Sequence, residues 1–150
     1  MKRIVFSIAF ILIAAVGFGQ IENPVSWDYS VKKKSADTYD VIITASIDDP
    51  WHIYSKNTGK GGPIPTNVTF KANPLITKTG ALQEIGKVEK VFDKNFNTNV
   101  LSFSDKVQYV QTVKVKAGIK TNISGTVEYM VCDDSHCLPP TKKTFDLKLQ

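Results

Sequence analysis

The chain has 150 residues, with 19 lysines and arginines against 14 aspartates and glutamates, and a formal net charge of +5. Its basic residues are scattered, apart from the run Lys32-Lys33-Lys34, and they are not interleaved with aromatic residues along a stripe. The composition therefore argues against a nucleic-acid-binding surface. The length is that of a single domain once a leader segment is set aside.

The chain begins with the basic segment Met1-Lys2-Arg3, followed by an apolar run over 4–16 and small residues before Gln20. This order is typical of a secretory signal peptide. We predict a signal peptide over 1–19 and a mature domain over 20–150, either periplasmic or secreted. The apolar run is shorter than the roughly 20 residues that span a bilayer, and an uncleaved N-terminal anchor is the alternative. No second apolar segment approaches that length, so we expect no membrane insertion after cleavage.

The mature part is dominated by period-two alternation of apolar and polar residues, which is typical of half-buried strands. Turn-forming residues such as Asp48-Asp49-Pro50 and Asn73-Pro74 separate these segments. Seven to nine short strands in about 130 residues favour an all-β, immunoglobulin-like sandwich, with a closed barrel as the alternative. The strands are expected, in chain order, over 25–33, 41–48, 51–55, 67–71, 75–85, 107–115, 123–131 and 145–150.

The stretch over 86–105 differs from the rest because its aromatic residues are set among polar ones without a steady period. We predict a long loop here, carrying Phe92 and Phe96. Two interpretations remain open. The two rings anchor the loop to the core, or the loop covers a site.

Both cysteines lie close together near the C-terminus, in the segment Val-Cys-Asp-Asp-Ser-His-Cys-Leu-Pro-Pro. A strand leading into Cys132 and four polar residues before Cys137 predict a tight, hairpin-like connection. Such a connection brings the two α-carbons within the roughly 4.4–6.8 Å that a disulfide needs. In an exported protein the two thiols are expected to pair. Because the closed loop is short, the bond should stabilise the fold only toward the low end of the usual range.

Three uses of this pair are compatible with the spacing. A structural disulfide is favoured on spacing alone, and a redox-active dithiol is the second interpretation. Asp133 and Asp134 would disfavour a nearby thiolate, whereas a protonated His136 would favour one. A zinc or copper site built from Cys132, Cys137, His136 and His52 is the third, but no second Cys/His pair stands at finger-like spacing. We therefore predict no metal and no cofactor.

The segment over 127–140 resembles the N-terminal periplasmic domain of the thiol:disulfide interchange protein DsbD. The resemblance is carried by Val127-x-Tyr129-x-x-Cys132 and by Cys137-x-Pro139-Pro140, followed by a closing strand. More loosely, 49–55 is similar to the family's early aromatic strand, 88–97 to its cap loop and 106–115 to its next core strand.

The resemblance implies an immunoglobulin-like fold and a thiol:disulfide oxidoreductase role. A membrane-embedded thiol reductase would donate electrons, and periplasmic thioredoxin-like proteins would accept them. A secreted, non-catalytic sandwich with an inert disulfide is the competing function. The chain as given holds neither a transmembrane reductase nor a thioredoxin-like domain, so its electron donor is expected to be a separate protein.

Residue by residue, the resemblance implies that Cys132 and Cys137 form the redox pair, with Cys137 attacking first. An aromatic cap is expected over the pair, from Phe92 in preference to Phe96. The loop between the cysteines is one residue shorter than in the best-known members, and Lys90-Val91 stands where those members have an acidic pair before the cap aromatic. The candidate neighbours of the pair are His52, Tyr54, Tyr129 and His136, with packing in the core or a loop as the competing role.

Overall fold

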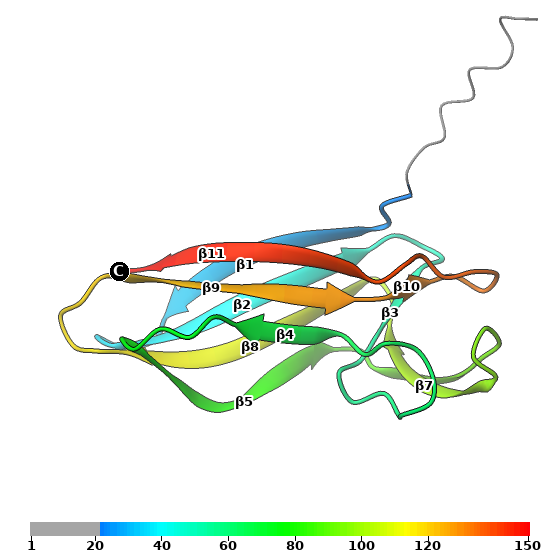
Figure 1. The fold of residues 1–150 in the computed structure, drawn as a ribbon, viewed down its shortest axis with the longest axis horizontal. Helices are drawn as coiled ribbons and strands as arrows, with labels where there is room; N and C mark the ends of the chain where they lie inside the picture. Colours follow the sequence, from blue (N-terminus) through cyan, green and yellow to red (C-terminus); the bar gives the residue numbers. More distant parts are fainter. Residues whose placement is uncertain (1–21) are drawn as a thin grey trace, which may run out of the picture.

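The computed structural model describes residues 22–150, so the expected signal peptide lies outside the described residues. The described part is entirely β-structure, loops and turns (Figure 1). Because it contains no helix, none of it forms a helix long and apolar enough to cross a membrane. The strands are β1 (Val25–Lys33), β2 (Thr38–Ile47), β3 (His52–Tyr54), β4 (Asn67–Phe70), β5 (Ile76–Gly86), β6 (Glu89–Asp93), β7 (Thr98–Phe103), β8 (Lys106–Val115), β9 (Thr121–Tyr129), β10 (Val131–Cys132) and β11 (Thr141–Leu149).

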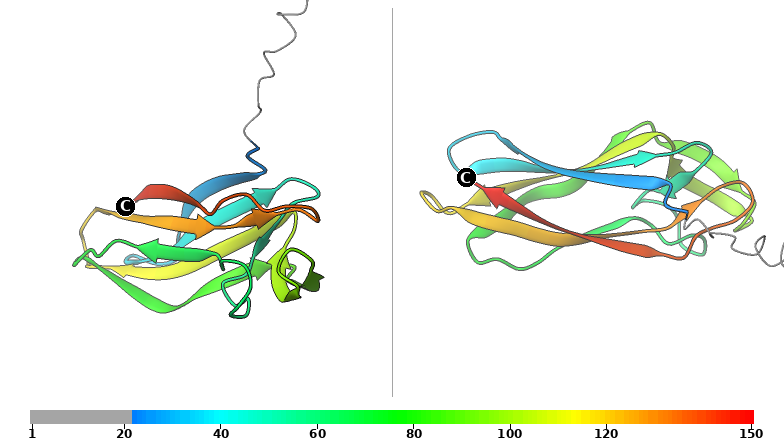
Figure 2. Two further views of the ribbon diagram at one scale, coloured as in Figure 1. Left: turned by 45° about the vertical axis from the view of Figure 1, so that its right-hand side comes forward. Right: turned by 90° about the horizontal axis from the view of Figure 1, so that it is seen from above.

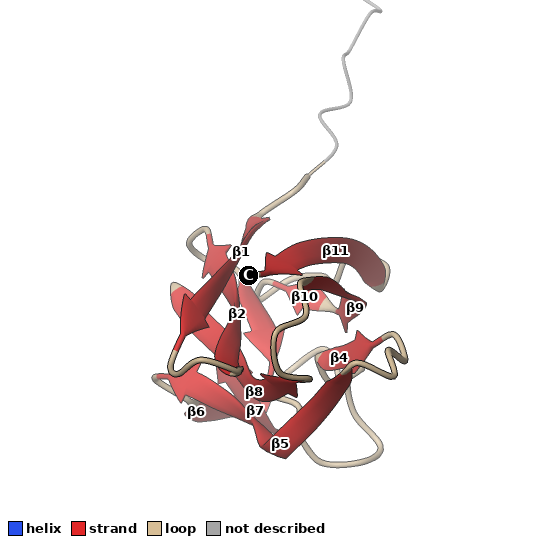
Figure 3. Ribbon diagram, turned by 90° about the vertical axis from the view of Figure 1, so that its left-hand side faces the viewer, coloured by secondary structure: helices blue, strands red, loops and turns tan. Residues whose placement is uncertain are grey.

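The strands form two facing layers, extended at one end by a third sheet. One layer has the strand order β1-β2-β8-β5 and the other has the order β11-β9-β4. The two layers are separate when seen from above (Figure 2) and nearly along the strands (Figure 3). The third sheet, β10-β3-β7-β6, lies at the end of the sandwich opposite the C-terminus (Figure 1). The predicted immunoglobulin-like sandwich is confirmed, and the closed barrel is not formed.

The core lies between the two layers and follows the alternation that the sequence shows. Ile43 of β2 and Tyr109 of β8 are fully buried and pack against Tyr129 of β9 and Phe145 of β11. Burial of these apolar side chains is the main force that holds the layers together. The alternation of β8 is interrupted by Gln111, a polar residue that is buried at a core position.

Gln111 occupies a core position of β8 without leaving its amide unpaired. Its Nε2 donates to the carbonyl oxygens of Thr79, Gly80 and Thr112 at 3.2, 3.3 and 2.9 Å. The register between β5 and β8 shifts between Thr79 and Gln83, so β5 bulges at this point. A bulge leaves backbone groups outside the ladder, and the Gln111 amide satisfies two of the carbonyls there.

The segment over 86–105 is a β-hairpin, and the prediction of a long loop is wrong. β6 and β7 pair antiparallel from Glu89 opposite Ser102 to Asp93 opposite Thr98. The four residues 94–97 form the turn between them, which we call the cap turn. β6 is an edge strand with four of its five residues outside the core. An edge strand of this kind has no apolar face to bury, so its sequence lacks the alternation that reveals a strand.

Candidate redox site

The two cysteines lie on a short hairpin, residues 131–138, which we call the cysteine hairpin. Asp133 N donates to His136 O at 3.0 Å and Leu138 N donates to Val131 O at 2.9 Å. Cys132 and Cys137 face each other between these two hydrogen-bonded pairs, as a disulfide with α-carbons 4.0 Å apart. Such non-hydrogen-bonded pairs bring α-carbons to about 4.5 Å, so the separation falls just below the predicted range. The predicted hairpin and disulfide are confirmed.

The Asp133 carboxylate organises the turn of this hairpin. Its Oδ1 accepts hydrogen bonds from the backbone N–H groups of Ser135 and His136, both at 2.7 Å, and from Ser135 Oγ at 2.8 Å. These bonds, led by the one from the His136 backbone, lower the pKa of Asp133 to about 2. Asp133 therefore carries a negative charge beside the cysteines at any physiological pH.

His136 is a neighbour of the disulfide on the outer side of the cysteine hairpin. Its Nε2 lies 3.2 Å from Glu22 Oε2, and its ring stands edge-on to Trp51 with centroids 5.2 Å apart. The hydrogen bond with Glu22 is the largest cause that raises the pKa of His136. The contact between Glu22 and His136 thus joins the start of the domain to the cysteine hairpin. In Figure 1 the start of β1 and the strand β10 lie at the same end of the sandwich.

The disulfide is half sunk into a small apolar cluster at this end of the molecule. Cys132 and Tyr54 are fully buried, with relative exposures of 0%, whereas Cys137 is half-buried. An incoming thiol therefore meets Cys137 before Cys132. The members of this disulfide cluster are Tyr54, Val100 and Cys132, with Phe96, Met130 and Cys137 packed against them.

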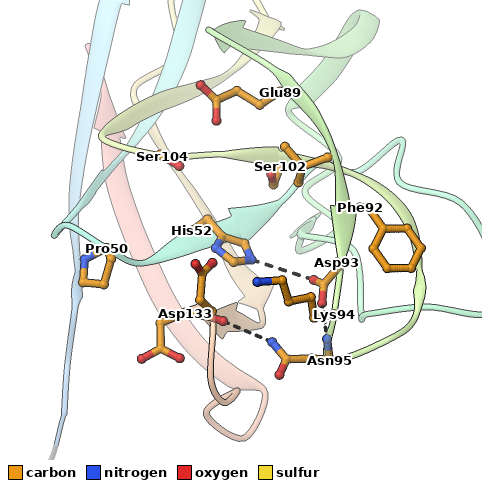
Figure 4. Close-up of a pocket in the computed structure, with 12 residues that line it drawn as sticks. Pro50, His52, Glu89, Phe92, Asp93, Lys94, Asn95, Ser102, Ser104 and Asp133 are labelled. Carbon is orange, nitrogen blue, oxygen red and sulfur yellow. Dashed lines mark hydrogen bonds and ion pairs between the residues drawn. The ribbon is translucent and has the colours of Figure 1, made fainter.

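A hydrogen-bonded network of His52, Tyr54 and Asp93 adjoins the disulfide cluster, of which Tyr54 is a member. Figure 4 shows the His52 ring directed toward the Asp93 carboxylate. Tyr54 Oη donates to Asp93 Oδ2 at 2.5 Å, and His52 Nε2 lies 3.2 Å from Tyr54 Oη. Burial, and then the hydrogen bond to Asp93, raise the pKa of Tyr54 well above its ordinary value. Burial lowers the pKa of His52, although Asp93 and Asp134 oppose this effect. At neutral pH the network thus contains a protonated tyrosine and an uncharged histidine.

Asp93 also shapes the cap turn that lies over the disulfide cluster. Its Oδ1 accepts the backbone N–H groups of Asn95 at 2.8 Å and Phe96 at 3.3 Å. Asn95 Nδ2 in turn donates to the carbonyl oxygen of Asp133 at 3.1 Å, which ties the cap turn to the cysteine hairpin. The Phe96 ring stands edge-on to the Tyr54 ring, with centroids 6.1 Å apart.

Phe96, and not Phe92, is the aromatic residue that the structure brings to the disulfide cluster. Phe92 is 58% exposed, and its ring lies on the opposite side of β6 from His52 (Figure 4). Adjacent residues of a strand point to opposite faces. Because Asp93 points inward to Tyr54, Phe92 must point outward. The preference for Phe92 as the cap is therefore wrong.

A family model for the N-terminal domain of the thiol:disulfide interchange protein DsbD matches residues 22–149. The chain belongs to this family. No curated protein matches the chain significantly in sequence.

Solved structures agree with the DsbD N-terminal assignment at the level of the fold. The N-terminal domain of DsbD from Neisseria meningitidis, in its reduced form, is 17% identical, with 83% of this chain and 84% of that chain covered and a TM-score of 0.54. The complex between the DsbD and PilB N-terminal domains of the same organism is 14% identical, with 85% of this chain and 88% of that chain covered and a TM-score of 0.54. The N-terminal periplasmic domain of ScsB from Proteus mirabilis is 12% identical, with 84% of this chain and 47% of that chain covered and a TM-score of 0.63. At these identities the likeness shows the fold alone.

Within this DsbD N-terminal fold, the remaining predicted neighbour, Tyr129, lies in the sandwich core. It is buried there against the Trp27 ring, with centroids 5.0 Å apart, and is not part of the disulfide cluster. Tyr129 thus has the competing role considered for it, a core aromatic. Among residues 22–150, no three or more His, Cys, Asp and Glu side chains are grouped to hold a metal ion.

The sequence analysis missed Asp93 and Asn95, although both have a role in this DsbD N-terminal site. An acidic or amide side chain that bonds the backbone two residues later is a common turn former. The run Asp93-Lys94-Asn95 therefore carried a turn signal. This signal does not reveal that Asp93 is buried, with a relative exposure of 6%, or that Tyr54 donates to its second oxygen.

We expect the disulfide to contribute little to global stability. Cys137→Ala opens a loop of only a few residues, for which the chain-entropy model gives about 2 kcal/mol. The free energy of unfolding, measured by urea denaturation without reductant, should fall by at most about 2–3 kcal/mol. A Cys137→Ala protein that fails to fold at 25 °C would show that the bond is an essential structural staple.

Proposed function

We propose that the chain is an exported thiol–disulfide exchange domain that relays electrons through the Cys132–Cys137 pair. Membership of the DsbD N-terminal family supports this function. The observation that carries it is the unequal burial of the two cysteines, with Cys132 fully covered and Cys137 half-buried at the surface. One reachable sulfur next to one protected sulfur suits a bond that opens and closes in a fixed order.

Each exchange passes through a mixed disulfide. A donor thiolate attacks Cys137 Sγ, the Cys132–Cys137 bond breaks, and Cys132 leaves as a thiolate that takes up a proton. The second thiol of the donor then displaces Cys137, so that the donor is oxidised and the pair becomes a dithiol. In the forward transfer, the Cys137 thiolate attacks an acceptor disulfide and Cys132 resolves the intermediate. Two electrons and two protons move in each half of the cycle.

A membrane-embedded thiol reductase is proposed as the donor and periplasmic thioredoxin-like proteins as the acceptors. Two of the solved structures support this partner class and compartment. One holds the N-terminal domain of DsbD in a complex with the N-terminal domain of PilB, and the other is a periplasmic domain of ScsB. The signal peptide expected over 1–19 would bring this chain to the same compartment.

The second candidate function is a non-catalytic binding module with an inert disulfide. The complete burial of Cys132 and the many hydrogen bonds within the cysteine hairpin favour this alternative. The two functions differ in the reduction potential that they require. Structural disulfides of secreted proteins lie below about −300 mV, whereas exchange domains lie between about −120 and −270 mV.

The reduction potential therefore tests the proposed function. We expect the pair to equilibrate with glutathione or dithiothreitol buffers at a potential above about −300 mV. The measurement is the fraction of free thiols, counted by mass spectrometry after alkylation across a series of buffers. A pair that stays oxidised in buffers well below −300 mV would favour the inert module.

A further inference from the structure

The strand register places His52 next to Cys132. β10 pairs antiparallel with β3, with Cys132 opposite His52 and Val131 opposite Ile53. Side chains of opposed residues project from the same face of a sheet, with β-carbons about 4.5–5.5 Å apart. Ile53 and Val131 point into the sandwich core, whereas Cys132 belongs to the disulfide cluster. Because Cys137 is opposite Cys132 on the other side, the histidine and both cysteines form one row across the sheet.

The hydrogen bonds around His52 determine which of its ring nitrogens carries the proton. The single hydroxyl proton of Tyr54 is donated to Asp93 Oδ2 at 2.5 Å. Tyr54 Oη can then only accept from His52 Nε2, which lies 3.2 Å away. A neutral imidazole that is protonated on Nε2 has its lone pair on Nδ1. Within residues 22–150, no hydrogen-bond partner is found for this Nδ1, so His52 has a free basic nitrogen.

The other charged groups near His52 are less suited to accept a proton. Asp93 on β6 uses both oxygens for Tyr54 and the cap turn, and Asp133 on the cysteine hairpin is committed to its own turn. Asp134, on the same hairpin, stands at an exposed position and is solvated. Glu89 and Lys94 line the cavity of about 210 Å³ that His52 also lines. His136, on the outer side of the cysteine hairpin, is paired with Glu22.

Cys132 needs such a base because it is fully buried. Burial raises the pKa of a thiol by disfavouring its charged form. The buried Cys132 must nevertheless become a thiolate to resolve a mixed disulfide on Cys137. A base whose own pKa lies near the working pH accelerates such a step by about 10²–10⁴-fold. His52 also lines a cavity, together with Asp93, Ser104 and Asp133 (Figure 4).

We propose that His52 accepts the proton of the Cys132 thiol in the resolving step, an inference that rests on the proposed exchange function. The proton moves from Cys132 Sγ to His52 Nδ1. The Cys132 thiolate then attacks Cys137 Sγ, the Cys132–Cys137 bond forms, and the bond between Cys137 and the partner sulfur breaks. The partner leaves as a thiolate and takes a proton from the imidazolium or from solvent. The pair is oxidised and the partner disulfide is reduced.

The test separates the two chemical steps with a chromogenic disulfide. The reduced protein is mixed with one equivalent of 5,5′-dithiobis(2-nitrobenzoate), and thionitrobenzoate release is followed by stopped flow. The first release reports the attack by Cys137, and the second reports the resolution by Cys132. His52→Gln keeps an N–H that can donate to Tyr54 but removes the base. Ser104→Ala, at an exposed position that lines the same cavity, is the control.

We expect His52→Gln to leave the first release unchanged and to slow the second at least tenfold at pH 7. In the variant, the second rate should rise about tenfold per pH unit, because only the spontaneously formed Cys132 thiolate reacts. It should approach the wild-type rate at alkaline pH. The wild-type rate should depend weakly on pH above the lowered pKa of His52 and fall below that pKa, where the imidazole becomes protonated.

Equal second rates in His52→Gln and the wild type across pH would overturn the proposal and leave the relay intact. A slowing that is the same at every pH would also overturn it, because it would indicate a packing role. A wild-type protein that never releases the second thionitrobenzoate would not re-form its disulfide, and the proposed exchange function itself would fail.

Discussion

Cys132→Ala and Cys137→Ala should both abolish electron relay, but only Cys132→Ala should accumulate a mixed disulfide. In Cys132→Ala the half-buried Cys137 still attacks a partner disulfide, and the resolving thiol is missing. In Cys137→Ala the remaining thiol is fully buried and cannot be reached. Relay by either variant should fall to the uncatalysed rate, since the exchange needs both sulfurs.

The measurement is mass spectrometry of each variant after incubation with oxidised glutathione. Cys132→Ala should carry one glutathione, whereas Cys137→Ala should remain unmodified over the same time. Unfolding both variants in urea before the incubation is the control, since both thiols should then react alike. A Cys137→Ala protein that reacts as fast as Cys132→Ala while folded would show that the order of attack is wrong.

Phe96→Ala should accelerate reduction of the disulfide by dithiothreitol roughly tenfold, because a thiolate must approach a sulfur that the cap turn covers. The Phe96 ring packs on the disulfide cluster and stands edge-on to Tyr54. Its loss opens the approach to the pair without breaking the hydrogen bonds between the cap turn and Asp93, which use backbone N–H groups. Since the ring is only partly buried, the free energy of unfolding should fall by less than the about 3–5 kcal/mol of a core Phe→Ala change.

Phe92→Ala is the matched control, because it makes the same substitution in the same hairpin on the opposite face of β6. We expect its rate of reduction to equal that of the wild type, since this ring is largely exposed and points away from His52 (Figure 4). The rates are measured by the appearance of free thiols in excess dithiothreitol. A Phe96→Ala rate equal to that of Phe92→Ala would show that the cap turn gives no kinetic protection.

The cap turn shows where prediction from the sequence reached its limit. The sequence indicated that aromatic residues between 86 and 105 cover or anchor something, and it named both phenylalanines. It did not reveal that β6 and β7 pair, because the edge strand β6 has no buried apolar face. Without that pairing, the side of the hairpin on which each ring lies is undetermined. The choice between Phe92 and Phe96 depends on the buried bond between Asp93 and Tyr54.

The sequence by itself determined the sandwich and the position of the disulfide. The strand expected over 25–33 has the bounds of β1, and the sequence separation of five between Cys132 and Cys137 is short enough for a hairpin that joins them. The strand pattern and the cysteine spacing are both set by residues that lie close together in the sequence. The tertiary structure decided which sulfur is covered, that Tyr129 faces the core, and that His52 lies opposite Cys132. Each of these depends on contacts between segments far apart in the chain, and local sequence patterns do not encode such contacts.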